Sequence, residues 1–274
     1  MPPIEQVGIG VQTKFLVERE LKTLYRDKIT FVVKISSSTV FGLLFGMIFY
    51  QIGNNSYEDY AEVMGSLGAI ANLLIGLMFG VGGTSLREFP IDRPIFLREY
   101  STNHYSILPY FFAKFTKECF EVFVQVAMQL VIAFFLMGFQ MNFFPFFILS
   151  FVLAITSNGI GILVGSIAED PNVAQELFPA LVVPQLLFSG FFIQSSLIPV
   201  FIRWAQYLCT LTYAIRLSSL FEFGDCDTFA CENLLTNNGV DEMPAYVYWI
   251  ILITIGTVFR VFALIVLKGK ATFK

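Results

Sequence analysis

The stretch Phe41-Gly-Leu-Leu-Phe-Gly-Met-Ile-Phe-Tyr50 decides the fold class, because it lies in a run without charge between Lys34 and Glu58. About 20 apolar residues in a helix are enough to cross a hydrocarbon core of about 30 Å. Pro179 and Pro184 interrupt a later apolar run, which we interpret as one kinked helix because neighbouring helices can satisfy the freed carbonyl groups. The sequence therefore predicts an all-α polytopic membrane protein with six transmembrane helices, at residues 35–52, 64–86, 119–138, 145–167, 177–194 and 245–267.

The composition of the chain agrees with this class and excludes others. Of the 274 residues, 56% are apolar and 14% are charged, and the mean hydropathy is +0.70, whereas soluble domains carry about 25% charged residues. The net charge of −4 excludes binding of nucleic acid through a global basic field. One His and four separated Cys cannot build a Cys/His zinc site. We expect no metal site and no nucleic-acid partner.

The sequence also lacks the patterns that catalysis needs. His104 stands alone in a polar link, and no Ser or Cys nucleophile has a second base to pair with it. There is no Gly-rich loop ending in Gly-Lys-Ser/Thr that would cradle phosphates. We therefore expect that the chain is not an enzyme by itself and carries no cofactor.

The distribution of basic residues predicts the orientation in the membrane. Most of the 17 Lys and Arg residues fall in an N-terminal segment (1–34), in the link between the second and third spans (87–118), and in the tail (268–274). The positive-inside rule places these segments, and with them both termini, in the cytoplasm. The six-helix transmembrane domain then covers residues 35–267, with a large extracellular loop at 195–244.

Residues 11–28 have apolar side chains at helical spacing among charged ones, which predicts an amphipathic elbow helix before the first span. Such a helix lies along the inner membrane surface or packs on a partner domain, and the sequence favours neither. At the other side of the protein, residues 197–223 are apolar and aromatic, with Trp204, Tyr207 and Tyr213 suited to a membrane boundary. We expect this segment to re-enter the membrane or to lie in its outer leaflet before the sixth span.

Two covalent modifications are candidates on the predicted extracellular side. Cys226 and Cys231 are five positions apart in the acidic half of the large loop, where the compartment favours disulfides. They form a bridge within the loop, a bridge between two copies of the chain, or two free thiols. Asn54, in Asn54-Asn-Ser56, is the candidate glycosylation acceptor in the link between the first two spans.

Glycine pairs one helical turn apart occur in three spans, at Gly42/Gly46, Gly76/Gly80 and Gly161/Gly165. The absence of side chains lets a second helix approach closely, which matters where the hydrophobic effect does not drive helices together. The pairs predict either a dimer seam or moving contact, or ordinary tight packing within one chain.

The link between the second and third spans carries the most specific pattern. It contains Phe96-Leu-Arg-Glu99 and then Tyr105-Ser-Ile-Leu-Pro-Tyr-Phe-Phe-Ala-Lys114, and Phe188-Ser-Gly-Phe-Phe192 follows the fifth span. These motifs resemble the membrane domain of the G subfamily of ATP-binding cassette (ABC) transporters, the white-type and pleiotropic-drug-resistance exporters with an ABC-2 type fold. The resemblance runs from about residue 12 to the last span. Lys117-Glu-Cys-Phe120 departs from it, because many relatives have a proline there.

The resemblance implies roles for particular residues. In that family the second and fifth spans line a central apolar cavity, which by position implies Leu77, Gly80, Val183 and Leu186 here. The residues after Ser189-Gly190 form an apolar plug, here Phe191 and Phe192, which are bulkier than the leucines often found there. The link would couple to the ATPase, by position through Arg93, Phe96, Arg98, Glu99 and Tyr105.

The resemblance also implies partners. Family members carry an ATPase domain ahead of the membrane domain, and this sequence shows none. Either the sequence is a fragment of a longer chain, or ATP and Mg would be bound by a nucleotide-binding domain on another polypeptide. A homodimer or heterodimer with another six-helix half is implied, in contact with membrane lipid. We expect an exporter of lipid-like or amphipathic compounds, in the plasma membrane by default or in an internal membrane. The alternative is a non-transporting membrane scaffold or regulatory partner of a full-length transporter.

Overall fold

The computed structural model describes residues 8–101, 107–168, 170–193, 197–226, 228–240 and 243–272. Within these ranges the chain is helical and has no strand. In chain order the helices are α1 (Ile9–Arg26), α2 (Lys28–Ile48), α3 (Tyr60–Ser101), α4 (Ile107–Met137), α5 (Phe143–Ile167), α6 (Pro171–Leu187), the short 3-10 helix η2 (Arg203–Leu208), α7 (Thr210–Phe223), α8 (Phe229–Asn237) and α9 (Ala245–Thr272).

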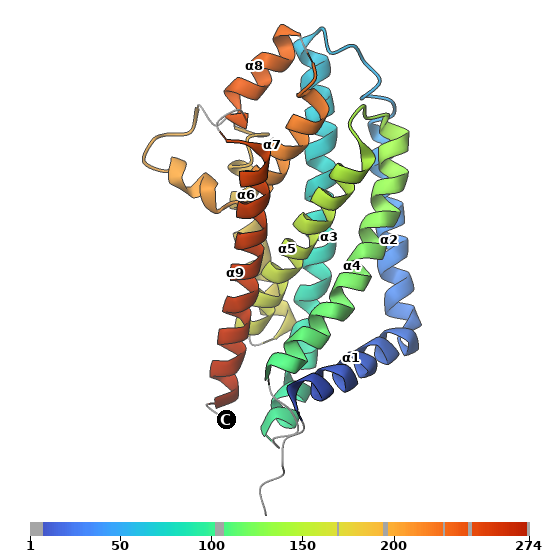
Figure 1. The fold of residues 1–274 in the computed structure, drawn as a ribbon, viewed down its shortest axis with the longest axis vertical. Helices are drawn as coiled ribbons and strands as arrows, with labels where there is room; N and C mark the ends of the chain where they lie inside the picture. The colour runs from blue at the N-terminus through green and yellow to red at the C-terminus, as the bar shows by residue number, and fades with distance from the viewer. Residues whose placement is uncertain are drawn as a thin grey trace, which may run out of the picture.

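The long helices run side by side along the long axis of the molecule, and α1 lies across one end of the bundle (Figure 1). That end, which we call the α1 end, also holds the C terminus, whereas α8 lies at the opposite end, the α8 end. The principal packing partners are α3 with α5, α2 with α4, and α5 with α9. The α1 end therefore gathers the basic segments that the sequence analysis assigned to one side of the membrane.

Among the described residues, five helices are long and apolar enough to cross a membrane: α2, α3, α4, α5 and α9. The predicted fifth span corresponds to α6, which has 17 residues and runs through Pro179 and Pro184 without a break. At about 1.5 Å per residue it is shorter than a hydrocarbon core of about 30 Å. It also begins and ends earlier than predicted, because the Asp170 side chain accepts hydrogen bonds from the amides of Asn172 and Val173 and so caps the helix at Pro171.

The predicted link at 87–118 is mostly helix. α3 continues past the apolar span through Pro90 and Pro94 to Ser101, and α4 begins at Ile107. A second apolar cluster holds this extension in place, since Phe89 and Phe96 pack with residues of α1, α4, α5 and α9. The helix survives its prolines because tertiary packing outweighs the lost backbone hydrogen bonds.

The segment expected to re-enter before the last span forms η2 and α7. Nearly every residue of α7 is buried, and the helix packs against α3, α5 and α9. Leu197, Val200 and Phe201, by contrast, are strongly exposed beside it. The segment thus combines an apolar outer surface with a helix inserted in the bundle.

Most of the paired glycines pack within the chain. A Cβ atom at Gly42 would lie 2.7 Å from the carbonyl oxygen of Gln129, and one at Gly46 would lie 2.7 Å from Leu136 Cδ1. A Cβ atom at Gly161 would overlap the carbonyl oxygen of Gly82 on α3, whereas one at Gly80 would meet no atom within 4 Å. Close packing inside one chain therefore accounts for Gly42, Gly46 and Gly161, and Gly80 is the open position.

One carboxylate of α7 joins two connections at the α8 end, the one between α2 and α3 and the one between α4 and α5. Glu222 of α7 accepts hydrogen bonds from the Tyr57 hydroxyl (2.5 Å), the Gln140 amide (3.1 Å) and the Met141 amide (2.9 Å). Thr228 donates its hydroxyl to the carbonyl oxygen of Tyr57 (2.9 Å). Burial, followed by the hydrogen bond to Glu222, raises the pKa of Tyr57 above its ordinary value, so its neutral hydroxyl remains a donor.

Cys226 and Cys231 form a disulfide within the chain, beside this carboxylate, and Cys119 and Cys209 are free thiols. We predict that alkylation of the unfolded, unreduced chain labels two of the four cysteines, and that the chain migrates as a monomer on a non-reducing gel. Closing so short a loop stabilises the fold by roughly 2 kcal/mol, so reduction should lower the thermal midpoint. A dimer band that disappears on reduction would contradict the intrachain bridge.

Candidate functional site

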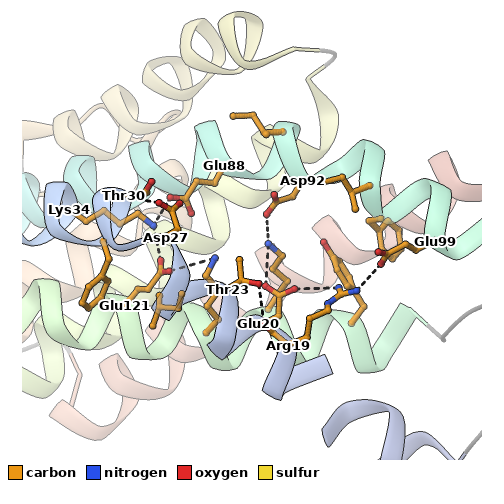
Figure 2. A pocket seen from close by; sticks show the side chains of 18 residues that line it. Arg19, Glu20, Thr23, Asp27, Thr30, Lys34, Glu88, Asp92, Glu99 and Glu121 are labelled. Carbon is orange, nitrogen blue, oxygen red and sulfur yellow. Dashed lines mark hydrogen bonds and ion pairs between the residues drawn. The ribbon is translucent and has the colours of Figure 1, made fainter. Parts of the chain in front are cut away.

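A cavity of about 580 Å³ lies at the α1 end, where α1, α2, α3 and α4 meet (Figure 2). The carboxylates and basic groups that line it come from all four helices. They are Glu20, Asp27, Glu88, Asp92, Glu99 and Glu121, and Arg19, Lys34, Lys114 and Lys117. Their ion pairs, together with a neighbouring cluster around Arg260, form what we call the charge network.

The first part of the network ties α1 to α3 and α4. Arg19 donates to Glu99 near the end of α3 at 3.0 Å and lies 3.4 Å from Glu20. Lys114 of α4 lies 3.7 Å from Glu20 and also pairs with Asp92 of α3. Because the partners come from three helices, the elbow helix α1 cannot move independently of the extension of α3 without breaking these pairs.

The second part centres on Lys34, near the start of α2. Its ammonium group lies 2.5 Å from Glu88 of α3 and 2.7 Å from Glu121 of α4, and Lys117 lies 3.6 Å from the other oxygen of Glu121. Lys34 and Glu121 are both buried. A buried charge is tolerated only when paired and hydrogen-bonded, so this pairing fixes α2 against α3 and α4.

The third part reaches the last helix. Arg260 of α9 donates to Glu118 of α4 at 3.0 Å and to the Asn158 side-chain oxygen of α5 at 2.6 Å. Asn158 in turn donates to Ser85 of α3, and the guanidinium of Arg260 lies 4.5 Å from the ring centre of Phe115. The charge network thus connects α1, α2, α3, α4, α5 and α9.

This arrangement is suited to mechanical connection rather than to reaction chemistry. Its acids and bases are paired with one another, apart from Asp27, which accepts from the Thr30 amide and caps α2. The described residues contain no cluster of three His, Cys, Asp or Glu side chains that could hold a metal ion. The pairs are charge-assisted and join helices that are distant in sequence. A displacement imposed on α1 or on the end of α3 is therefore resisted by every other long helix.

The residues predicted to couple to an ATPase have different positions. Arg93 donates to the carbonyl oxygens of Ala168 (2.5 Å) and Ser166 (3.4 Å), where it caps the end of α5. Phe96 is buried and its ring centre lies 4.4 Å from that of Tyr110. Phe96 therefore packs inside the apolar cluster at the α1 end, so a part in coupling, which stays a prediction, would act through its packing and not through direct contact.

Arg98 and Glu99 remain accessible on the last described turn of α3, with Glu99 bonded to Arg19. Tyr105 lies outside the described residues, as does His104. The structure thus brings Glu99 into the charge network, and it leaves Arg98 beside it on the surface.

The residues assigned to a substrate cavity by position do not share one surface. Leu77 is 1% exposed and lies in the core, so it cannot line an open cavity and this assignment needs correction. Gly80 and Val183 are exposed, and Leu186 is partly buried against the core. Leu77 is instead part of the main apolar core of the bundle.

The other predicted positions lie at the α8 side of α6 and in the α2–α3 connection. The rings of Phe191 and Phe192 meet edge to face at 4.8 Å; Phe192 is exposed and Phe191 packs against the core. Asn54 is exposed.

The sequence analysis did not identify Glu20, Lys34, Lys114 and Glu118 as site residues. A signal was present, because Lys114, Lys117, Glu118 and Glu121 recur at helical spacing just before a charge-free span. Such charges are expected to find partners when a helix is packed on several sides.

Comparison with known proteins places the chain in a family. The profile of the ABC-2 type transporter family matches residues 11–223. The chain is 27% identical to ABC transporter G family member 1 of Dictyostelium discoideum, across 96% of this chain and 35% of that protein. It is 29% identical to ABC transporter G family member 38 of Oryza sativa subsp. japonica (80% of this chain, 15% of that protein). It is 26% identical to Protein white of Drosophila melanogaster (77% of this chain, 32% of that protein).

The chain spans about a third or less of the length of these relatives. The family profile nevertheless covers most of this chain, and its long apolar helices make it an integral, multi-pass membrane protein. The domain that matches is the membrane part of such transporters, which is not itself the ATPase. The chain belongs to the ABC-2 type transporter family, as a transmembrane domain of the G subfamily of ABC transporters.

Proposed function

We propose that this transmembrane domain forms one half of the membrane pathway of an ATP-driven exporter of lipid-like or amphipathic compounds. The observation that carries the proposal is the match to the ABC-2 type transporter family over residues 11–223. In the proposed orientation, the α1 end and both termini are cytoplasmic, and the α8 end, with the large loop at 195–244, is extracellular. A nucleotide-binding domain on another chain, or on a longer form of this one, binds ATP and Mg and hydrolyses the ATP that drives export.

The charge network supports a route for coupling. Closure of the nucleotide-binding domains would push on the end of α3, near Arg98 and Glu99. Glu99 is bonded to Arg19 of α1, and the pairs of Lys34 and Arg260 extend from this region to α2 and α9. In this proposal the network carries the displacement to the helices that open and close the pathway.

The pathway itself would form between this half and a second one. α6 has a buried stripe against the bundle, and most of its other apolar side chains are exposed. Those side chains are Val173, Leu177, Leu181, Val183 and Leu187. Gly80 and Phe79 expose a further apolar surface on α3. Contiguous apolar surface of this kind fits a partner helix or an amphipathic substrate.

A substitution at the end of α3 tests the coupling role. We expect Glu99→Gln, assayed in proteoliposomes with the nucleotide-binding domain present, to keep ATP turnover and to lose most of its export. The reason is that the amide no longer forms the ion pair with Arg19 that joins α3 to α1. Arg98→Gln should act in the same direction.

The matched control is Glu18→Gln, which removes the same charge from an exposed pair with Lys22 on α1. It should leave both rates unchanged. Export by Glu99→Gln at the wild-type rate would count against the coupling role. If export does not require this chain at all, the alternative role as a scaffold or regulatory partner of a full-length transporter takes its place.

A further inference from the structure

The cavity between α1, α2, α3 and α4 has the size and the walls of a ligand site. Its volume of about 580 Å³ falls within the roughly 300–1,000 Å³ of small-molecule pockets. Apolar side chains form one part of its wall, and charged side chains form another. The apolar ones include Leu24, Phe31, Ile91 and Ile95. A cavity with both kinds of wall fits a molecule that has a charged group and an apolar tail.

The charge that such a molecule would meet is mainly negative. The lysines are the shielded members of the ion pairs, with side-chain exposures of 7% for Lys34, 14% for Lys114 and 15% for Lys117. Three of the carboxylates are more accessible, at 36% for both Glu88 and Asp92 and 32% for Glu99, whereas Glu20 at 9% and Glu121 at 8% are as shielded as the lysines. Arg19, at 42%, is the accessible basic group, and it is bonded to Glu99 and Glu20. The six carboxylates also outnumber the four basic groups of the lining.

Two of these carboxylates each bind a lysine through one oxygen, Oε1 of Glu88 to Lys34 and Oδ2 of Asp92 to Lys114, and each keeps a second oxygen for a further donor. Glu88 and Asp92 are four residues apart on α3, so they lie on the same face, about 5–6 Å apart at their Cβ atoms. Both line the cavity, and Figure 2 shows them on successive turns of the helix. An ammonium group has three donors and can bond both.

The cavity lies where the outer surface of the bundle changes from charged to apolar side chains. Asp27, Thr30 and Phe31 line it, and the exposed apolar surface of α2 begins among the same residues, at Ile29, Val32 and Val33. The surface of the protein therefore changes from polar to apolar within about one turn of α2. A tail could follow the apolar surface while its headgroup enters the cavity.

We infer that this cavity binds the ammonium headgroup of an amphiphile from the adjoining membrane leaflet, between the carboxylates of Glu88 and Asp92. The shared chemistry is a protonated amine on an apolar tail, and it comes from a membrane lipid such as phosphatidylethanolamine or from a free alkylamine. The site is separate from the surface of α6 and α3 proposed for export, and its occupation does not depend on ATP.

The test uses the full chain in phosphatidylcholine nanodiscs, without ATP or a nucleotide-binding domain. The probe is a long-chain alkylammonium with a photoreactive group in its tail, and mass spectrometry maps the labelled residues. We expect saturable labelling of the peptides that contain Leu24, Phe31, Ile91 or Ile95. The uncharged alcohol of the same chain length should not compete.

Glu88→Gln and Asp92→Asn should each raise the half-saturating probe concentration by about tenfold, the loss expected for one charge-assisted hydrogen bond. Each variant leaves the neighbouring lysine a second carboxylate, Glu121 for Lys34 and Glu20 for Lys114, so the fold should persist; a thermal melt checks this. Glu18→Gln, which removes an equal charge outside the cavity lining, should bind as wild type.

Labelling confined to other helices, equal competition by the alcohol, or wild-type binding by a folded Glu88→Gln/Asp92→Asn variant would each overturn the inference. If added phosphatidylethanolamine displaces the probe, the ligand is a lipid headgroup; if only free alkylamine displaces it, the ligand is a free amphiphile. The assay contains no ATPase, so its result is independent of export. The proposed export could be disproved while this binding site is confirmed, and the binding site could be disproved while export is confirmed.

Discussion

Gly161→Ala is expected to be the most damaging single-methyl substitution among the paired glycines, and to lower the amount of folded protein in the membrane sharply. The new Cβ would overlap the carbonyl oxygen of Gly82 and lie 3.3 Å from the backbone nitrogen of Leu86. Both obstacles are backbone atoms of α3, so no side chain can rotate away and α3 and α5 must separate. Overpacking of this kind costs about 1–3 kcal/mol. Thermal unfolding in detergent and quantitative membrane expression measure the effect.

Gly80→Ala is the matched control, because its Cβ would meet no atom within 4 Å. It should be neutral, or slightly stabilising through the better helix propensity of alanine. Equal loss of stability in the two variants would contradict this prediction. It would show that the glycines contribute helix flexibility and not the close α3–α5 contact.

Arg260→Met is expected to destabilise the protein by up to about 3 kcal/mol, the lower end of the effect of leaving one member of a buried ion pair alone, because this pair is 11% and 15% exposed. Glu118 would keep its charge in the bundle without the guanidinium that now lies 3.0 Å away. Asn158 would lose the donor to its side-chain oxygen as well. The shift of the thermal midpoint in detergent gives the size of the effect.

The double variant Arg260→Met/Glu118→Gln should recover most of this loss, because no unpaired charge remains. As a comparison, Lys22→Met removes the cation of an exposed pair on α1, and its thermal midpoint should stay at the wild-type value. A double variant no more stable than Arg260→Met alone would mean that the arginine acts through its packing on Phe115 rather than through its charge.

The fold class could be predicted from the sequence because hydropathy is a local property. The run around Phe41–Phe45 is free of charge in the sequence and helical in the structure. Helix ends were harder to place. The start of α6 depends on the cap at Asp170 and on Pro171, which hydropathy does not register. The extension of α3 through Pro94 depends on packing with α1, α4, α5 and α9, and a proline-containing polar segment gives no local sign of it.

The site was less accessible to prediction because its pairs are formed by tertiary structure. Arg19 and Glu99 are 80 residues apart, and Arg260 and Glu118 are 142 apart. The sequence could show that these charges border apolar spans, but not which of them meet. The assignment of Leu77 to the substrate cavity failed for the same reason, because tertiary packing decides which apolar residues are buried. Gly80, three residues further along α3, has no atom near its Cβ position. The sequence could not show which face of α3 is buried, because this depends on how the helix packs in the bundle.

If the chain exports a compound as proposed, the hydrogen bonds of the Glu222 carboxylate limit how an exit at the α8 end could open. From α7, Glu222 bonds Tyr57 before α3 and Gln140 and Met141 between α4 and α5. The segment after α7 is closed by the Cys226–Cys231 disulfide, and its Thr228 bonds the Tyr57 carbonyl oxygen. Connections clamped in this way cannot swing aside one at a time. An exit at this end would have to open by a rigid-body movement of α7 together with the two connections bonded to Glu222. The backbone would then bend in the segments that Glu222 does not bond.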